Sequence, residues 1–313
     1  QRRNNILVKK NASVPDFTGI QLPDENFGIV DNKGFEVELG YRDGGKDFTY
    51  SFNGNVSFAR NKVIEFDEPE RQVAWQVQTG QPQGAELLYK AIGIFRDEQQ
   101  VTSVPHVEGA RPGDIIIQDY DKNGKIDNDD RILFPKTVNP EVNYGFAFNL
   151  KFRNWGLNGL IQGSGNSMRK VYSALQGLAG NYFDYDAVGR WTPDNINASK
   201  PRAFDRNDAY WRESYVTDYS YQNAAYARMK NLQLIYTLPK RIQNLTRLQD
   251  AQVYVSGQNL FLLYSGNKVL DPEIGGIMTR TGSVATDADR YSAAGINNYP
   301  IMKIYTIGTR ISF

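Results

Sequence analysis

Apolar and polar residues alternate along much of the chain. In the segment 47–58, every even position is apolar or glycine, while the odd positions carry Asp, Thr, Asn or Ser. Successive side chains of a strand point to opposite faces, so this period of two predicts strands with one apolar and one polar face. We expect about eight of them, one ending near Val8 and the others at 28–42, 47–60, 142–153, 155–163, 224–238, 250–263 and 301–313.

The predicted strands are long, and their connections alternate in length. The alternation lasts roughly 9–12 residues, enough for a tilted strand to cross a bilayer, whereas strands of soluble proteins average about 5–6. The short connections are 42–47, 153–154 and 239–250, and the long ones are 9–27, 63–141, 166–222 and 265–298. This order predicts an up-and-down transmembrane β-barrel with short periplasmic turns and long extracellular loops, although a soluble β-sandwich also alternates.

The amino-acid composition of the chain mainly excludes several classes of function. Lys and Arg number 36 against 35 Asp and Glu, so the charge balance does not indicate a nucleic-acid partner. The chain has no cysteine and a single histidine, His106, which excludes a disulfide framework, a thiol nucleophile and a His-based triad or zinc site. No phosphate-binding, dinucleotide-binding or nucleophile-elbow motif occurs, so we expect neither an enzyme nor an organic cofactor.

The stretch DYDKNGKIDNDD at 119–130 has the spacing of an EF-hand calcium loop without the flanking helices. Its candidate ligands are Asp119, Asp121, Asn123, Lys125, Asp127 and Asp130. The seventh position ligates through its backbone carbonyl, so a lysine is compatible there, and the glycine at the sixth permits a sharp turn. Asp130 replaces the usual longer, bidentate glutamate. We predict a structural calcium ion, and the alternative is an acidic turn without one.

Aromatic residues gather in the long connection 166–222. Trp191, Tyr210 and Trp211 are candidates for contact with substrate or with a lid-like partner, because aromatic rings stack on sugars and grip peptide side chains. The alternative, which we favour for any single one of them, is packing within the loop, since a loop of this length needs a small core of its own.

The chain ends on an alternating strand with a terminal aromatic residue. Its apolar positions include Tyr305, Ile307, Ile311 and Phe313. An exposed, alternating edge of this kind is an aggregation hazard in a soluble protein, whereas a closed barrel pairs it with another strand. We therefore interpret these four residues as a barrel-assembly signal rather than as an ordinary edge strand.

Four stretches together carry a family resemblance. They are NFGIVDNKGFEVEL at 26–39, PGD at 112–114 followed by DYDKNGKID at 119–127, ARMKNLQLIYTLP at 227–239, and VYVSGQNLF at 253–261. In this order they resemble motifs of the SusC/RagA family of TonB-dependent outer-membrane transporters of the Bacteroidota. The resemblance spans nearly all of the chain.

The resemblance implies that residues 1–313 are the C-terminal part, about eight strands, of a 22-stranded barrel. The family's plug and N-terminal domains are absent from this chain. It further implies TonB-dependent uptake of oligosaccharides or peptides beneath a SusD-like surface lipoprotein, with TonB acting through the missing part. The barrel would contact outer-membrane lipids, and the calcium loop would stiffen one extracellular loop.

Two other functions remain open on the sequence. A passive porin-like channel would also be a barrel, and a plug with a TonB box upstream would distinguish the two. A soluble, calcium-stabilised β-rich binding or adhesion protein would need no detergent.

Overall fold

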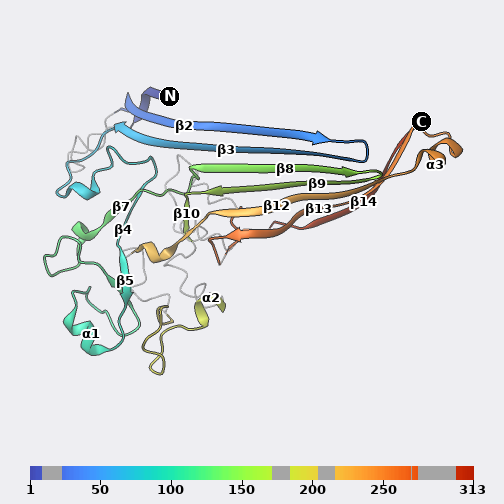
Figure 1. The fold of residues 1–313 in the computed structure, drawn as a ribbon. Helices are drawn as coiled ribbons and strands as arrows, with labels where there is room; N and C mark the ends of the chain where they lie inside the picture. The colour runs from blue at the N-terminus through green and yellow to red at the C-terminus, as the bar shows by residue number, and fades with distance from the viewer. Residues whose placement is uncertain (9–22, 171–183, 204–215, 269, 274–300) are drawn as a thin grey trace.

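An antiparallel sheet dominates the computed structural model, which describes residues 1–8, 23–170, 184–203, 216–268, 270–273 and 301–313. Its eight strands follow the order β1-β2-β3-β8-β9-β12-β13-β14, so each strand pairs with its neighbours along this meander (Figure 1). The prediction of an all-β, antiparallel, up-and-down architecture is confirmed. Within the described residues β1 and β14 are edges and do not close the sheet into a barrel.

The strands lie where the alternation predicts them. They are β1 (Arg2–Val8), β2 (Glu25–Gly44), β3 (Phe48–Glu65), β8 (Val142–Phe152), β9 (Trp155–Gly165), β12 (Tyr226–Thr237), β13 (Asp250–Ser265) and β14 (Ile304–Ser312). β2 and β3 have 20 and 18 residues. A tilted strand needs only about 9–11 residues to cross a bilayer, so this hairpin is long enough to extend beyond it.

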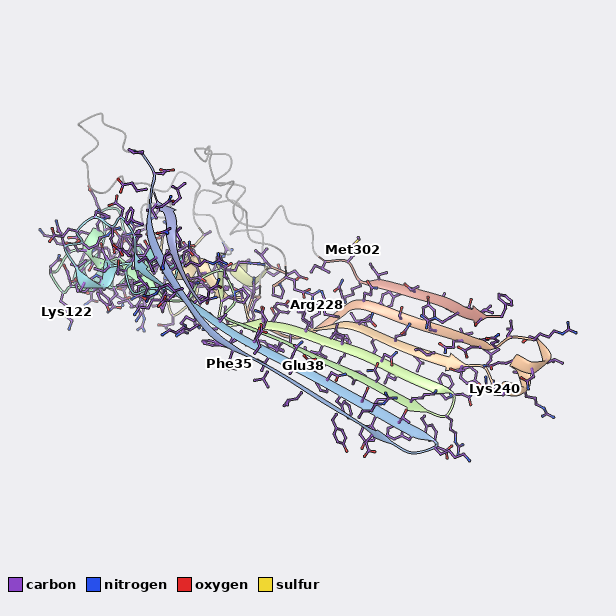
Figure 2. All side chains as sticks on the ribbon, turned by 90° about the horizontal axis from the view of Figure 1, so that it is seen from above. Phe35, Glu38, Lys122, Arg228, Lys240 and Met302 are labelled. Carbon is purple, nitrogen blue, oxygen red and sulfur yellow. The ribbon has the colours of Figure 1, made fainter. Side chains whose placement is uncertain are left out.

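One face of the sheet is apolar and open. On β2 the side chains of Phe35, Leu39 and Tyr41 are 58%, 72% and 56% exposed. Across the pairing, Phe35 faces Phe58 with ring centroids 5.8 Å apart, and such aromatic pairs stabilise neighbouring strands. Figure 2 labels Phe35 and Glu38, which belong to the apolar and the polar set of β2.

Glycines on the apolar face make room for aromatic rings of the neighbouring strand. A Cβ at Gly159 would lie 2.2 Å from Phe148 Cζ, and one at Gly163 would lie 2.3 Å from Tyr144 Cζ. The register pairs these residues directly, Phe148 with Gly159 and Tyr144 with Gly163. Each ring therefore covers a glycine, which offsets the weak packing of glycine in a strand.

The long connections hold small elements of their own. They are the 3-10 turns η2 (Ala74–Gln76), η3 (Asn128–Asp130) and η7 (Asp218–Ser220), the strand pairs β4 (Glu86–Leu88) with β7 (Ile132–Phe134), β5 (Ala91–Ile94) with β6 (Ile115–Ile117) and β10 (Met168–Lys170) with β11 (Tyr221–Asn223), and the helices α1 (Glu98–Ser103) and α2 (Asp184–Ala187). Buried Phe95, Val101 and Ile116 form a small core there. Most of the described buried hydrophobic side chains lie in this loop region, since the sheet itself is one layer.

A further helix, α3 (Lys240–Leu245), lies at the opposite end of the strands, between β12 and β13 (Figure 1). The sequence predicts only a short connection there, without a helix. Among the described helices, none combines the length and apolar character needed to cross a membrane.

Candidate functional site

The acidic loop 119–130 is a tight turn built from side chain to backbone hydrogen bonds. Asp119 accepts from the backbone N of Asn123 at 3.1 Å and of Gly124 at 2.9 Å, and Asn123 accepts from Lys125 N at 2.8 Å. Gly124 has φ +83°, which a side chain at this position would disfavour. These bonds gather the side-chain oxygens of alternate residues on the inside of the loop.

Asp130 closes the loop from its last position. Its side chain is fully buried and accepts hydrogen bonds from Tyr120 N at 2.6 Å and Asp127 N at 2.8 Å. Burial raises the pKa of the Asp130 carboxyl above its usual range, while the backbone donors act in the opposite direction. Asp130 therefore joins the two ends of the loop in addition to any role as a ligand.

An earlier segment of the chain holds this loop in place. The Trp75 indole donates to the Asp129 carbonyl at 2.7 Å, and the Gln76 amide donates to the Asn128 carbonyl at 2.6 Å. The rings of Trp75 and Tyr120 meet edge to face with centroids 5.0 Å apart. The loop is thus positioned by η2, which precedes it by about 50 residues in the sequence.

The carboxylates fit a hard cation. Oxygens of Asp119, Asp121 and Asp130 lie within 4.8 Å of one another, and those of Asp121, Asp127 and Asp129 form a second such group. None of these five carboxylates makes an ion pair within the described residues. Calcium takes about 6–8 oxygen ligands, so convergent acidic groups without a cationic partner suit it.

The predicted ligand set and the structure overlap, with one addition. Asp119, Asp121 and Asp130 converge in one group and Asp127 joins Asp121 in the other, and the Asn123 side chain is hydrogen-bonded to Asp121 at 2.9 Å. Ligation through the backbone of Lys125 remains a prediction. Asp129 was not foreseen, because the spacing rule assigns its position no ligand role.

The connection containing Trp191 packs on the connection that contains the acidic loop. The Trp191 indole donates to the Arg96 carbonyl at 3.1 Å, and its ring lies so close to Gly113 that a Cβ there would be 2.6 Å from Trp191 Cε3. Next to it, Arg202 pairs with fully buried Asp114 at 2.6 Å. Trp191 thus packs between loops, and its contact with substrate or a lid remains a prediction. Tyr210 and Trp211 lie outside the described residues.

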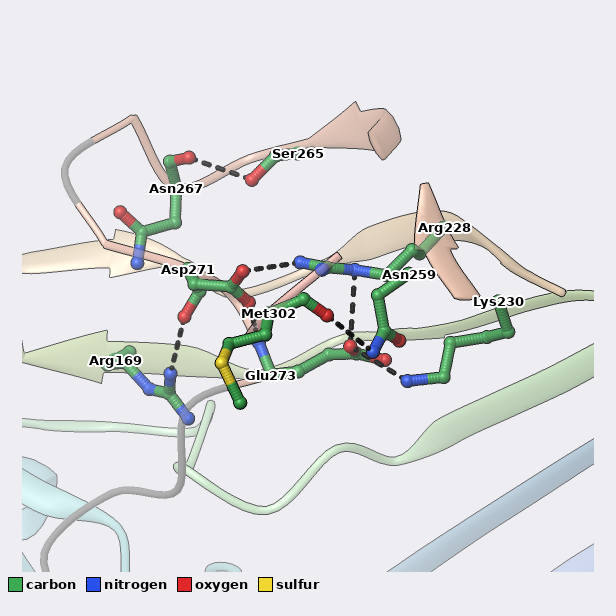
Figure 3. A network of polar contacts seen from close by, with 9 residues as sticks. All are labelled: Arg169, Arg228, Lys230, Asn259, Ser265, Asn267, Asp271, Glu273 and Met302. Atoms are coloured by element: carbon green, nitrogen blue, oxygen red, sulfur yellow. Dashed lines mark hydrogen bonds and ion pairs between the residues drawn. The ribbon is translucent and has the colours of Figure 1, made fainter. Parts of the chain in front are cut away.

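A second cluster is centred on Arg228 of β12 (Figure 3). Its side chain, only 4% exposed, lies 2.6 Å from Asp271 and 3.1 Å from Glu273, and Lys230 lies 3.1 Å from Glu273. Arg169 donates to the Asp271 carbonyl at 3.2 Å, and burial lowers the pKa of this arginine. The segment after β13 is therefore fastened to the sheet by opposite charges.

The sequence did not predict this cluster. Arg228 and Lys230 stand two apart in a strand and so share a face, and Asp271 and Glu273 repeat that spacing beyond β13. This doublet of basic and acidic residues was the available signal. Their pairing depends on how the chain turns back after β13, which spacing does not reveal.

The polar face of the sheet also carries a hollow of about 680 Å³. Its polar lining includes Glu36, Glu38, Asn55, Ser57, Asn143 and Gln162, from four neighbouring strands. Side chains of this kind bind water and hydroxylated or charged solutes rather than lipid. The two faces of the sheet thus suit two different environments.

Comparison with known proteins relates the whole chain to one group of receptors. No protein-family model matches the chain. TonB-dependent receptor P3 of Formosa agariphila is 27% identical over 96% of the chain, and TonB-dependent receptor SusC of Bacteroides thetaiotaomicron is 24% identical over 80% of it. The RagAB peptide transporter structure matches all of the chain with a TM-score of 0.69 at 18% identity. The chain is SusC/RagA-like.

The SusC/RagA-like chain spans less than a third of the length of these proteins: 30% of P3, 25% of SusC and 32% of the RagAB chain. The resemblance inferred from the motifs is therefore confirmed, and it applies to a segment of the length of these relatives. The relatives' names are those of receptors and a transporter, in agreement with the expectation that the protein is not an enzyme.

The four residues interpreted as a barrel-assembly signal lie at the end of the SusC/RagA-like chain. Tyr305, Ile307 and Ile311 belong to edge strand β14, and Phe313 follows it. All four side chains are at least half exposed, at 71%, 78%, 50% and 85%. That barrel-assembly machinery recognises these four residues remains a prediction.

Proposed function

We propose that this chain forms part of the barrel wall of a TonB-dependent outer-membrane transporter that imports nutrients. The observation that carries the proposal is the two-faced sheet, on a chain whose relatives are TonB-dependent receptors. The apolar face would contact lipid and the polar face would line the interior, as in barrels that alternate apolar-out and polar-in.

The exposed apolar surface supports a bilayer rather than water on that face. Phe35 and Leu39 of β2 and Phe152 of β8 are each at least 50% exposed, and both strands belong to the same sheet. Soluble monomers rarely expose contiguous apolar patches larger than a few hundred square ångströms. A soluble binding or adhesion protein would have to cover this face, whereas a membrane protein inserts it.

The imported substrate is an oligosaccharide or a peptide, delivered with a SusD-like lipoprotein partner. The likeness to the RagAB peptide transporter supports the peptide class, and the oligosaccharide class rests on the motif resemblance alone. In this proposal the long connections face the cell exterior and contact the partner and the substrate. TonB would act through a part of the protein outside this chain.

A calcium ion at Asp119, Asp121, Asp127 and Asp130 would have a structural role in this assembly. The convergent carboxylates and their anchoring by Trp75 and Gln76 support the site. The ion would neutralise the gathered negative charge and keep the loop closed. No transport step is assigned to it.

Purification of the full-length protein from outer membranes tests the proposal. We expect detergent-dependent extraction, an intact mass far above the 35.4 kDa of this chain, and a co-purifying lipidated partner. A water-soluble species would overturn the membrane assignment and favour the soluble alternative.

Uptake assays distinguish active import from a passive channel. Cells expressing the protein would be given labelled oligosaccharides or labelled oligopeptides, with and without TonB. We expect uptake of one substrate class to require both TonB and the surface partner. Uptake that persists without TonB would identify a porin-like channel instead.

A further inference from the structure

The turn that contains α3 has the largest net positive charge of the three short connections. Between Pro239 and Gln249 there are three basic residues and no acidic one. By contrast, the turn 42–47 contains Asp43 and Asp47 beside its basic residues, and Arg153 of the turn 153–154 lies 3.5 Å from Asp47. An unneutralised basic segment attracts phosphate-bearing surfaces.

The basic side chains of this turn face solvent. Lys240, Arg241 and Arg247 are exposed, and none of them makes an ion pair with any residue in the described part of the chain. Lys240 donates one bond to the Gln249 carbonyl at 3.3 Å. Their charges are therefore available to an external partner.

Apolar side chains accompany these charges. Leu245 is 85% exposed and Ile242 is 44% exposed. They stand three residues apart on α3, so they share one side of the helix. Gln243, only 1% exposed, is buried against the turn and donates to the Leu238 carbonyl at 2.8 Å. The helix thus has a packed side and an open apolar side flanked by basic residues.

Aromatic residues of the apolar face lie at the strand ends that lead into α3. Tyr236, four residues before α3, contacts Trp155 with ring centroids 4.7 Å apart, and Phe152 beside this pair is 50% exposed. Aromatic residues of this kind gather where a bilayer meets water. α3 follows Tyr236 closely in the chain and lies beyond the ends of the strands (Figure 1).

We propose that the α3 turn is a lipid-interface anchor, in which Ile242 and Leu245 enter the headgroup–acyl boundary while Lys240, Arg241 and Arg247 bind lipid phosphates. Short amphipathic helices bind membrane surfaces by this combination of buried apolar area and charge. The proposal rests on the membrane location proposed above and assigns a new contact to it. The anchor would fix the height of the strand ends in the bilayer.

A fluorescent label that senses its surroundings tests the anchor. This chain has no cysteine, so Leu245→Cys provides a single labelling position within it. The full-length variant would be labelled with a nitrobenzoxadiazole group and reconstituted in phosphatidylethanolamine vesicles with or without phosphatidylglycerol. Quenching by nitroxide-bearing lipids would be compared with quenching by a water-soluble nickel chelate.

Two control positions calibrate the result. Val255→Cys lies on the apolar face of β13, where the side chain is 50% exposed, and Lys46→Cys lies in the β2–β3 turn. We expect the label at 245 to resemble that at 255, with a blue-shifted emission and quenching by headgroup-level nitroxides, and the label at 46 to be quenched mainly from water. Adding K240Q, R241Q and R247Q to L245C should abolish the additional blue shift that phosphatidylglycerol produces.

The controls separate the two proposals. A label at 245 that is quenched from water as strongly as the label at 46, while the label at 255 remains lipid-quenched, would overturn the anchor alone. A label at 245 shielded from both quenchers would also overturn it, because another protein segment would then cover the helix. Failure of lipid quenching at 255 as well would contradict the membrane location itself.

Discussion

The guanidinium of Arg228 lies 2.6 Å from the carboxylate of Asp271, although 43 residues separate them in the sequence. Arg228 belongs to the sheet, whereas Asp271 follows the end of β13 (Figure 3). The pair therefore fixes the path of the chain where it leaves the sheet. Glu273 and Lys230 extend it to a network of four charges.

Replacing Arg228 should release the described residues after β13, 267–268 and 270–273, from the sheet. R228M leaves Asp271 and Glu273 without their main cation, and breaking a buried ion pair from one side typically costs about 3–5 kcal/mol. We expect faster amide hydrogen exchange and faster proteolysis in this segment. R310M, which removes an exposed arginine from edge strand β14, is the matched control. Equal protection in both variants would contradict the role of Arg228.

The ion pair of Arg202 with Asp114 should couple the two long connections. R202L removes the Arg202 guanidinium from fully buried Asp114, so the docked segment around Trp191 should detach, at a cost of about 3–5 kcal/mol. Hydrogen exchange should increase in 190–203 and at 93–96 together. The exposed K122Q provides a control, and protection that persists in R202L would show that the remaining contacts, among them the Trp191 hydrogen bond to Arg96, hold the loops without the ion pair.

We expect that even a methyl group at position 159 would destabilise the protein, because the Phe148 ring occupies the space above Gly159. G159A places a Cβ against the Phe148 ring, and overpacking of this kind costs about 1–3 kcal/mol. G54A is a matched control, since the nearest atom to its Cβ would be Phe146 Cδ2 at 3.8 Å. The test is the denaturant midpoint of the detergent-solubilised protein. F148L in the G159A background should restore part of the loss, and an unchanged midpoint in G159A would contradict the argument.

Calcium should stabilise the acidic loop. Chelation should quench or shift the fluorescence of Trp75, because its indole binds the Asp129 carbonyl and its ring contacts Tyr120. D119N with D121N should remove the response to added calcium, and D194N, outside the loop, should leave it intact. A calcium-independent signal in the unaltered protein would identify the loop as an ion-free turn.

The contact of Tyr221 with Glu86 should weaken at high pH. Burial first, and then the carboxylate of Glu86, raise the pKa of Tyr221 far above the usual value of 10.0. Because the unfolded tyrosine ionises near pH 10 while the folded one resists ionisation, the folded state holds more protons above that pH. Its stabilisation, complete below pH 10, is therefore lost as the pH rises further.

Y221F provides the comparison for this pH dependence. Hydrogen exchange in 216–223, measured from pH 8 to pH 11 and corrected for intrinsic rates, should accelerate above pH 10 in the unaltered protein and less in the variant. Identical profiles would contradict a titrating role for Tyr221.

The alternation along the chain was enough to predict the sheet. From Phe35 to Tyr41, apolar residues alternate with others. This alternation predicts that the segment is a strand, and it also predicts which side chains share the apolar face. The eight strands, their order and the short turn at 153–154 followed because antiparallel neighbours joined in sequence leave few alternatives. The spacing of Asp119, Asp121 and Asp127 likewise indicated convergent carboxylates, since a tight loop brings alternate residues inward.

Only the tertiary structure revealed the contacts between distant segments. Trp75 beneath the acidic loop, Arg202 on Asp114 and Arg228 on Asp271 each join residues at least 43 positions apart. Such pairings depend on the paths of irregular connections, which carry no period that a sequence could display. Local periodicity therefore determined the sheet, whereas long-range packing and charge pairing decided how the connections are fastened to it.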